Sequence, residues 1–179
     1  NSNPVISHCR IFNSNTSGIL VITNGLGHIL HSDIFENKYG NILIDTAANP
    51  TIDHCQIYRS PLYGISVTDN GLGHILHSDI FENGFANIEI GTAANPTIDR
   101  CKIYNSKSYG IQVKENGLGH ILHSDIFENK DANITIDTAG NPTIDRCKIY
   151  RSQRYGIQVT ANGLGHILHS DIFENEDAN

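Results

Sequence analysis

The sequence lacks any hydrophobic run that approaches 18 residues, and it lacks an excess of positive charge. A membrane-spanning helix needs about 20 apolar residues, so no such span is expected. Twelve Lys and Arg residues stand against 19 Asp and Glu residues, which gives a formal net charge of −7. Non-specific binding to nucleic acid depends on neutralising phosphates, so this charge argues against it. We therefore expect neither a membrane nor a nucleic acid as partner.

Amphipathic helical periodicity is also missing, because Gly, Asn and Pro interrupt every short apolar segment. A helical solenoid would need apolar residues at i, i+3, i+4 and i+7 over ten or more residues. The sequence instead contains a long internal repeat. The string NGLGHILHSDIFEN occurs four times unchanged, at 46-residue steps, starting at Asn24, Asn70, Asn116 and Asn162.

Each 46-residue unit divides into two 23-residue halves whose apolar positions coincide. Apolar residues such as Ile65 and Val67 are two positions apart, the spacing at which side chains return to one face of a strand. A Gly/Asn column, which runs from Gly18 to Asn179, indicates a corner with a left-handed backbone. We therefore predict an all-β fold, a right-handed single-stranded parallel β-helix (β-solenoid). Residues 4–179, divided by 23, give about 7.6 coils.

One uninterrupted stack without a linker predicts a single domain over residues 1–179. The chain starts without Met, and its units are nearly identical, so we expect a fragment of a longer protein or an engineered repeat protein. Open coil ends would expose unpaired backbone groups, and end-to-end self-association is a further expectation.

Four cysteines lie 46 residues apart, and serine fills the same column in the coils between them. Strands are about 4.8 Å apart, so successive cysteines should lie about 9.6 Å apart, beyond the ~7 Å reach of a disulfide. They also lack the paired spacing of a zinc site. We expect reduced, inward side chains in a structural core ladder. Its members are Cys9, Cys55, Cys101, Cys147, Ser32, Ser78, Ser124 and Ser170.

Two further columns are candidates for partner binding. An aromatic column should point outward as an apolar strip, unless its rings stack on one another to stiffen the sheet. A second column contains His and Arg; a flat ladder of imidazoles does not converge, so we expect no metal and no cofactor. The candidate residues are Tyr58, Phe81, Tyr104, Phe127, Tyr150, Phe173, His77, Arg100, His123 and Arg146.

Three segments recur every 46 residues: NP-x-I-x-x-C-x-I (Asn49 to Ile57), Y-G-I-x-V (Tyr109 to Val113) and N-G-L-G (Asn116 to Gly119). Together they resemble the β-helix repeats of carbohydrate-binding and sugar-hydrolase (CASH) domains, most of all the β-helix domain of F-box-only ubiquitin-ligase subunits. The resemblance covers essentially the whole chain and implies a substrate-recruiting platform. The sequence contains neither an F-box segment nor a cysteine-rich zinc finger, so it would be the recognition fragment at most.

Enzymes that act on polysaccharides are the rival class. A catalytic site needs an acid and a base in distinct environments, whereas every carboxylate of NGLGHILHSDIFEN is present four times in near-equivalent surroundings. Constant spacing also leaves no room for the long loops that wall a polysaccharide cleft. We therefore predict that the chain is not an enzyme and has no catalytic residues.

The leading prediction is a non-catalytic interaction module that recognises a protein partner, as the F-box resemblance implies. A polysaccharide-binding or polysaccharide-degrading β-helix is one alternative. A structural rod that stacks end to end is another. Reduced thiols and the resemblance favour an intracellular location, in the cytoplasm or the nucleus.

Overall fold

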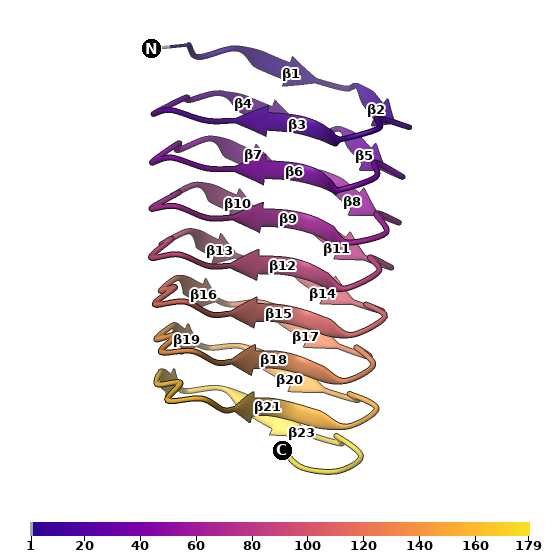
Figure 1. Ribbon diagram of the computed structural model, residues 1–179. Helices are drawn as coiled ribbons and strands as arrows, with labels where there is room; N and C mark the ends of the chain where they lie inside the picture. Colours follow the sequence, from indigo (N-terminus) through magenta and orange to yellow (C-terminus); the bar gives the residue numbers. More distant parts are fainter. Residues whose placement is uncertain (1) are drawn as a thin grey trace.

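The computed structural model describes residues 2–179, in which 23 short strands are wound into a stack of coils. Three parallel sheets, named A, B and C below, form the sides of a prism, and the coils succeed one another from the indigo end to the yellow end (Figure 1). Across residues 2–179 no helix occurs that is long and apolar enough to cross a membrane.

The strands of sheets A and B have three residues each, and those of sheet C have five. Sheet A contains β1 (Val5–Ser7), β4 (His28–Leu30), β7 (Thr51–Asp53), β10 (His74–Leu76), β13 (Thr97–Asp99), β16 (His120–Leu122), β19 (Thr143–Asp145) and β22 (His166–Leu168). Sheet B contains β2 (Arg10–Phe12), β5 (Asp33–Phe35), β8 (Gln56–Tyr58), β11 (Asp79–Phe81), β14 (Lys102–Tyr104), β17 (Asp125–Phe127), β20 (Lys148–Tyr150) and β23 (Asp171–Phe173). Sheet C contains β3 (Ser17–Val21), β6 (Gly40–Ile44), β9 (Tyr63–Val67), β12 (Ala86–Ile90), β15 (Tyr109–Val113), β18 (Ala132–Ile136) and β21 (Tyr155–Val159).

The strand register follows the 23-residue step of the sequence. Ile75 pairs with Ile98 in sheet A, Ile80 with Ile103 in sheet B, and Ile88 with Ile111 in sheet C, always in parallel. These isoleucines point inward and are 0% exposed. β-Branched side chains fit the pleated surface well, so a column of isoleucines from each sheet forms the core. The predicted all-β parallel solenoid is confirmed.

Buried asparagines occupy the corner between sheets B and C. Asn83 Nδ2 donates to Asn87 Oδ1 at 2.8 Å. Asn87 Nδ2 in turn donates to the carbonyl of Tyr104 at 2.9 Å and to Asn129 Oδ1 at 3.2 Å. Asn87, Tyr104 and Asn129 belong to three successive coils, and both asparagines of the first pair are 0% exposed. Amide side chains therefore tie the coils together inside the prism, where unpaired polar groups would be costly.

The predicted left-handed backbone in the Gly/Asn column is wrong. Gly64 has no positive φ; a Cβ there would lie 2.6 Å from the carbonyl oxygen of Asn87 and 2.7 Å from Asn83 Nδ2. Glycine is needed at this column because the asparagine amides take up the space. The left-handed residues lie at other corner positions, which in one coil are His54, Arg59, Asp69 and Asn70, with φ of 53°, 55°, 46° and 59°.

Candidate functional site on the outer face of sheet C

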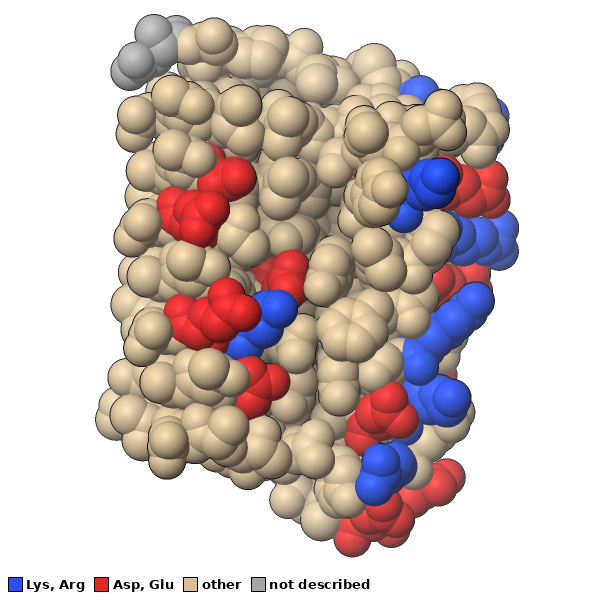
Figure 2. Space-filling model, viewed as in Figure 1, with Lys and Arg blue, Asp and Glu red and all other residues tan. Residues whose placement is uncertain are grey.

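The outer face of sheet C carries one column of side chains that departs from the 46-residue repeat everywhere except at Gln112 and Gln158. Its members lie between the inward residues of each strand: Leu20, Leu43, Ser66, Glu89, Gln112, Thr135 and Gln158. Four of them point away from the core and are nevertheless 3–8% exposed: Ser66, Glu89, Gln112 and Thr135. Side chains can be buried on an outer face only if their neighbours rise around them. The four therefore form the floor of a shallow trough, and Figure 2 shows this face hollowed between its margins.

An ion pair lies at the centre of this trough. Glu89 Oε1 is 2.9 Å from Lys114 Nζ, and Ser66 Oγ donates to Glu89 Oε2 at 2.7 Å. The Glu89 side chain is 6% exposed and that of Lys114 is 26% exposed. Both residues break the 46-residue repeat, because Thr135 and Thr160 stand one unit later. The trough therefore has a charged pair that the other units do not copy.

The proton donors beside Glu89 hold their protons firmly. Burial lowers the pKa of Lys114, but the hydrogen bond and charge of Glu89 outweigh it, so the pKa lies above its ordinary value. Burial raises the pKa of Tyr63, and the Glu89 carboxylate raises it further. Lys114 is therefore an ammonium and Tyr63 a neutral phenol at neutral pH.

Gln112 presents an acceptor without a partner. Its Nε2 donates to Asp137 Oδ2 at 3.3 Å, and Gln112 is 8% exposed. Among residues 2–179, Gln112 Oε1 is the one buried side-chain oxygen or nitrogen that has no hydrogen-bond partner. Leaving a buried acceptor unpaired costs about 1–3 kcal/mol, so a rotation of the Gln112 side chain that brings this carbonyl to a hydroxyl or amine donor of a ligand would be favourable.

Three half-buried aromatic rings, which the sequence columns did not reveal, lie beside the polar cluster. Phe85 contacts Tyr63 at 5.7 Å and Tyr109 at 5.5 Å between ring centroids, both at 88° between planes. Edge-to-face packing fixes the rings without covering all of their faces. The other margin is acidic, and Figure 2 shows acidic groups gathered there with one basic group among them.

The predicted aromatic strip lies on the outer face of sheet B, and its rings stack on one another. Tyr58 and Phe81 are 4.9 Å apart with 9° between planes, and Tyr104 and Phe127 are 4.9 Å apart with 7°. The column continues through Tyr150 to Phe173 in the same way. Because each ring covers the face of the next, the strip presents mainly ring edges to solvent. A partner-binding role for it stays a prediction.

The predicted His/Arg column lies at the corner between sheets A and B. His77 contacts Asp53, while His123, Arg100 and Arg146 contact the equivalent residues Asp99 and Asp145. Asp53, His54 and His77 place three possible metal-ligand atoms within 4.8 Å of one another. The His column alone does not converge, which is why the sequence predicted no metal; the neighbouring aspartate supplies the third ligand atom.

The predicted Cys/Ser ladder lies at the same corner but inside it. Burial raises the pKa of the Cys101 thiol to about 12 and that of Cys147 to about 11. Cys55 is also buried, whereas Cys9, in the first coil, is exposed. The serines supply acceptors, since Ser124 Oγ accepts from the Cys101 amide at 3.1 Å. The remaining ladder serines, Ser32, Ser78 and Ser170, do the same for Cys9, Cys55 and Cys147.

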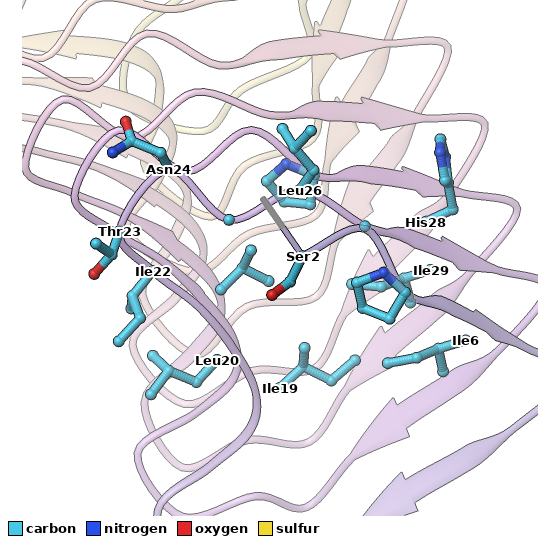
Figure 3. A pocket seen from close by; sticks show the side chains of 15 residues that line it. Ser2, Ile6, Ile19, Leu20, Ile22, Thr23, Asn24, Leu26, His28 and Ile29 are labelled. Atoms are coloured by element: carbon cyan, nitrogen blue, oxygen red, sulfur yellow. The ribbon is translucent and has the colours of Figure 1, made fainter.

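A separate hollow of about 560 Å³ lies at the first coil (Figure 3). Ile6, Ile19, Leu20 and Ile29 line it, and His28 is the one titratable side chain in its lining. It offers apolar contact but little chemistry, so the trough on sheet C is the better candidate site.

Residues 40–178 match the family model described as right handed beta helix region. The chain belongs to this right-handed β-helix family. The right hand in the family's description agrees with the right-handed parallel β-helix predicted from the sequence. No curated protein matches this β-helix closely enough to suggest a narrower relationship. Nothing in the comparisons links it to the F-box-only subunits that its repeats resemble.

Two solved structures share the fold of this β-helix. The Azotobacter vinelandii mannuronan C-5 epimerase AlgE4 A-module is 15% identical, with a TM-score of 0.79 over 98% of this chain and 57% of that chain. Pectate lyase Pel9A is 13% identical, with a TM-score of 0.71 over 95% of this chain and 51% of that chain. The β-helix thus spans little more than half the length of either protein.

The prediction that this β-helix is not an enzyme is contradicted by these structures, because both carry the names of enzymes. Near-equivalent surroundings are a property of the carboxylates in the fourfold-repeated segment. Glu89 and Lys114 lie outside that segment, in the variable half of the unit, and have distinct surroundings.

Proposed function

We propose that this β-helix is a carbohydrate-active protein that binds a polysaccharide chain along the outer face of sheet C. The observation that carries the proposal is the buried, unpaired Gln112 Oε1 on the floor of the trough. Sugars present many hydroxyl donors, and a buried acceptor strongly favours a ligand that supplies one. The epimerase and the lyase that share the fold are named for polysaccharides, which supports the same class of ligand.

The rest of the trough complements a sugar chain. The floor runs across β9, β12, β15 and β18, perpendicular to the coils, so a linear polymer could contact several strands in succession. Tyr63, Phe85 and Tyr109 add apolar ring surface beside hydrogen-bonding groups. Ligand sites commonly combine aromatic surface with a few well-placed polar groups.

The charge of the face favours a neutral or amino-sugar polymer. The acidic margin comprises Asp45, Asp69, Glu115 and Asp137, and Lys114 in its midst is already paired with Glu89. A polyuronate, such as the polymers for which the epimerase and the lyase are named, would meet net negative charge. Like-charge contacts are costly, so discrimination against polyanions should follow.

The cluster has several groups that can form hydrogen bonds with a sugar. Glu89 offers carboxylate oxygens as acceptors, while Lys114 and Tyr63 are donors whose raised pKa values keep them protonated at neutral pH. The same raised pKa values make both groups weak acids, because a general acid works best with a pKa near the working pH. The cluster therefore supports polymer binding, and product assays test polymer modification.

Binding should be measured by affinity electrophoresis and calorimetry with a neutral β-glucan, chitosan, pectate and mannuronan. Reducing ends, unsaturated products and sugar configuration would be followed in the same mixtures. We expect binding of the β-glucan or chitosan, and at least a tenfold loss in Gln112→Leu. Binding confined to pectate and mannuronan would contradict the expected discrimination against polyanions. The absence of binding to every one of the four polymers would contradict the proposed function.

Two matched variants come from the chain itself. Glu89→Thr and Lys114→Thr install the residues found one unit later, so the backbone already accepts them. Both should weaken polymer binding, whereas Lys102→Thr on sheet B should not. If the protein instead recruits a partner protein, as the F-box resemblance implies, polymer binding will be missing and a captured partner will persist in all three variants.

A further inference from the structure

One group of side chains at the corner between sheets A and B is not used by the polysaccharide proposal. From β7 onward an aspartate ends every second strand of sheet A: Asp53 in β7, Asp99 in β13 and Asp145 in β19. The histidine of the following coil contacts each of them. The Nδ1–Oδ1 distances are 3.0 Å for His77, 2.8 Å for His123 and 2.8 Å for His169.

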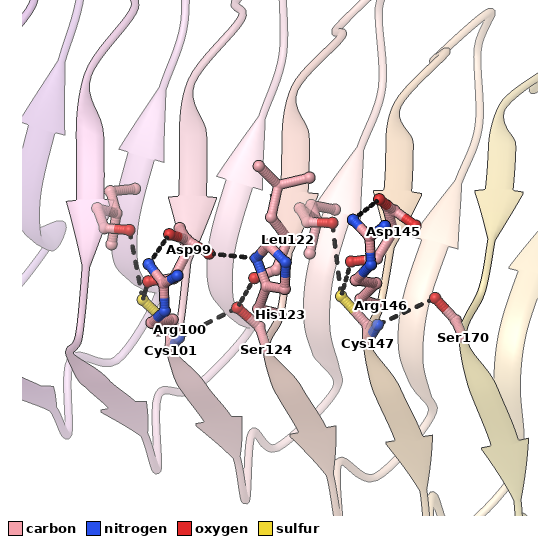
Figure 4. A network of polar contacts seen from close by, with 12 residues as sticks. Asp99, Arg100, Cys101, Leu122, His123, Ser124, Asp145, Arg146, Cys147 and Ser170 are labelled. Atoms are coloured by element: carbon pink, nitrogen blue, oxygen red, sulfur yellow. Dashed lines mark hydrogen bonds and ion pairs between the residues drawn. The ribbon is translucent and has the colours of Figure 1, made fainter.

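The residue that follows each aspartate differs between the units. Arg100 Nη1 lies 2.6 Å from Asp99 Oδ2, and Arg146 Nη1 lies 2.9 Å from Asp145 Oδ2 (Figure 4). A fixed guanidinium therefore neutralises those two carboxylates. Beside Asp53 the equivalent residue is His54, whose Nδ1 is 2.9 Å from Asp53 Oδ1.

Two imidazole nitrogens consequently meet one carboxylate oxygen at Asp53. The three ligand atoms lie within 4.8 Å of one another, and within residues 2–179 this is the one such group of His, Cys, Asp and Glu side chains. Tetrahedral zinc with bonds of about 2.0–2.2 Å needs ligand atoms about 3.4 Å apart. The nitrogen–oxygen contacts of 2.9 Å and 3.0 Å would widen slightly to admit an ion, and the two Nδ1 atoms, which lie within 4.8 Å of each other, would settle at the same separation.

The backbone also holds the two histidines in place. His54 and His77 both have a left-handed backbone, with φ of 53° and 44°. Their rings stack at 5.0 Å with 24° between planes. Both side chains remain partly exposed, at 52% and 40%, so an ion can enter from solvent and keep a water ligand. A pre-positioned set of ligands loses little entropy on binding.

We propose that Asp53, His54 and His77 form a binding site for a transition-metal ion of the zinc type. Imidazole and carboxylate ligands suit Zn²⁺, and Co²⁺ can report on the geometry. Asp99 and Asp145 do not form such a site, because a guanidinium occupies the position of the second imidazole. The site lies at the corner between sheets A and B, away from the trough on the outer face of sheet C, and does not depend on the proposed function.

The units of the chain provide the test. Isothermal titration of the whole chain with Zn²⁺ at neutral pH should give one tight equivalent. His54→Arg installs the arginine that follows Asp99 and Asp145 in the other units, and it should weaken the affinity for this Zn²⁺ ion about 100-fold. Asp53→Asn should weaken it to a similar extent. Arg100→His copies the Asp53 site and should add a second equivalent. Co²⁺ absorption should show tetrahedral coordination in the wild-type chain.

His31 supplies the control for the stacked column. Its ring lies on the other side of His54, 5.1 Å away and tilted by 33°, with Leu30 in the place of the aspartate. His31→Asn should therefore leave the tight equivalent unchanged. Zn²⁺ binding that survives His54→Arg, or that disappears in His31→Asn, would overturn the proposal in favour of the histidine column. A wild-type titration without a tight equivalent would overturn it outright.

Discussion

The inner columns of this β-helix and the outer column of sheet C follow opposite rules. Inside, isoleucine recurs at each coil, and asparagine alternates with glycine along one corner. On the outer face of sheet C, Ser66, Glu89, Gln112 and Thr135 succeed one another without a pattern. Inner residues must fit the coils above and below, so a change in one coil affects its neighbours. Outer residues meet fewer constraints, and chemistry can vary there while the fold stays constant.

The largest expected effect on stability comes from breaking the inner asparagine ladder. Asn129 Nδ2 donates to the carbonyl of Phe127 at 3.0 Å and to Asn133 Oδ1 at 2.9 Å, and its Oδ1 accepts from the Ser106 amide at 2.9 Å. Asn129→Ala leaves several buried groups unpaired, each worth about 1–3 kcal/mol, so we expect a loss of about 3–5 kcal/mol in urea unfolding. Asn175→Ala, in the same column but partly exposed, should cost clearly less; equal losses would contradict the ladder's role.

A pair of glycines gives the next largest contrast. A Cβ on Gly64 would lie 2.6 Å from the Asn87 carbonyl oxygen, whereas a Cβ on Gly91 would meet Lys114 Cε at an ordinary 3.6 Å. We expect Gly64→Ala to lower the free energy of unfolding by about 1–3 kcal/mol through overpacking. Gly91→Ala should stay within about 0.5 kcal/mol of the wild type. Thermal and urea unfolding of both variants would check this, and a tolerant Gly64 would show that the inner corner can relax.

The smallest expected effect concerns the ion pair on sheet C. Lys114→Thr leaves Glu89 nearly buried without its cation, and we expect a loss of about 1–2 kcal/mol. Adding Glu89→Thr should recover most of that loss, because the double variant resembles the next unit. The coupling free energy from the four proteins is the measurement. Additive losses in the double variant would mean that the two side chains act independently.

The sequence was sufficient for the fold because its period sets its pairing. A 23-residue coil places Ile80 beside Ile103, and the structure has that register. The alternation of Asn and Gly was visible too, but its cause was not. Sequence reasoning assigned it to backbone conformation, whereas Gly64 makes room for the amides of the neighbouring coil.

The candidate site was not predicted, because the predictions rested on the residues that repeat and the charged pair at its centre does not. Glu89 and Lys114 could have been found as departures from the 46-residue unit, since Thr135 and Thr160 take their places one unit later. The burial of these two side chains could not have been predicted from the sequence, because it depends on how far the margins of sheet C rise around them. The contact of Asp53 with His77 was equally hidden, since the two residues are 24 apart and meet only across a corner with a left-handed backbone.

The asparagine corner also sets the step by which such a protein can lengthen during evolution. An asparagine coil needs a glycine coil beside it, because a side chain at Gly64 or Gly110 would collide with the amides of Asn83 or Asn129. Duplicating a single 23-residue coil would place two asparagine coils, or two glycine coils, in contact. Duplicating 46 residues preserves every neighbour. Gene duplications that add two coils should therefore survive selection more often than those that add one. Related proteins should then differ in length by even numbers of coils.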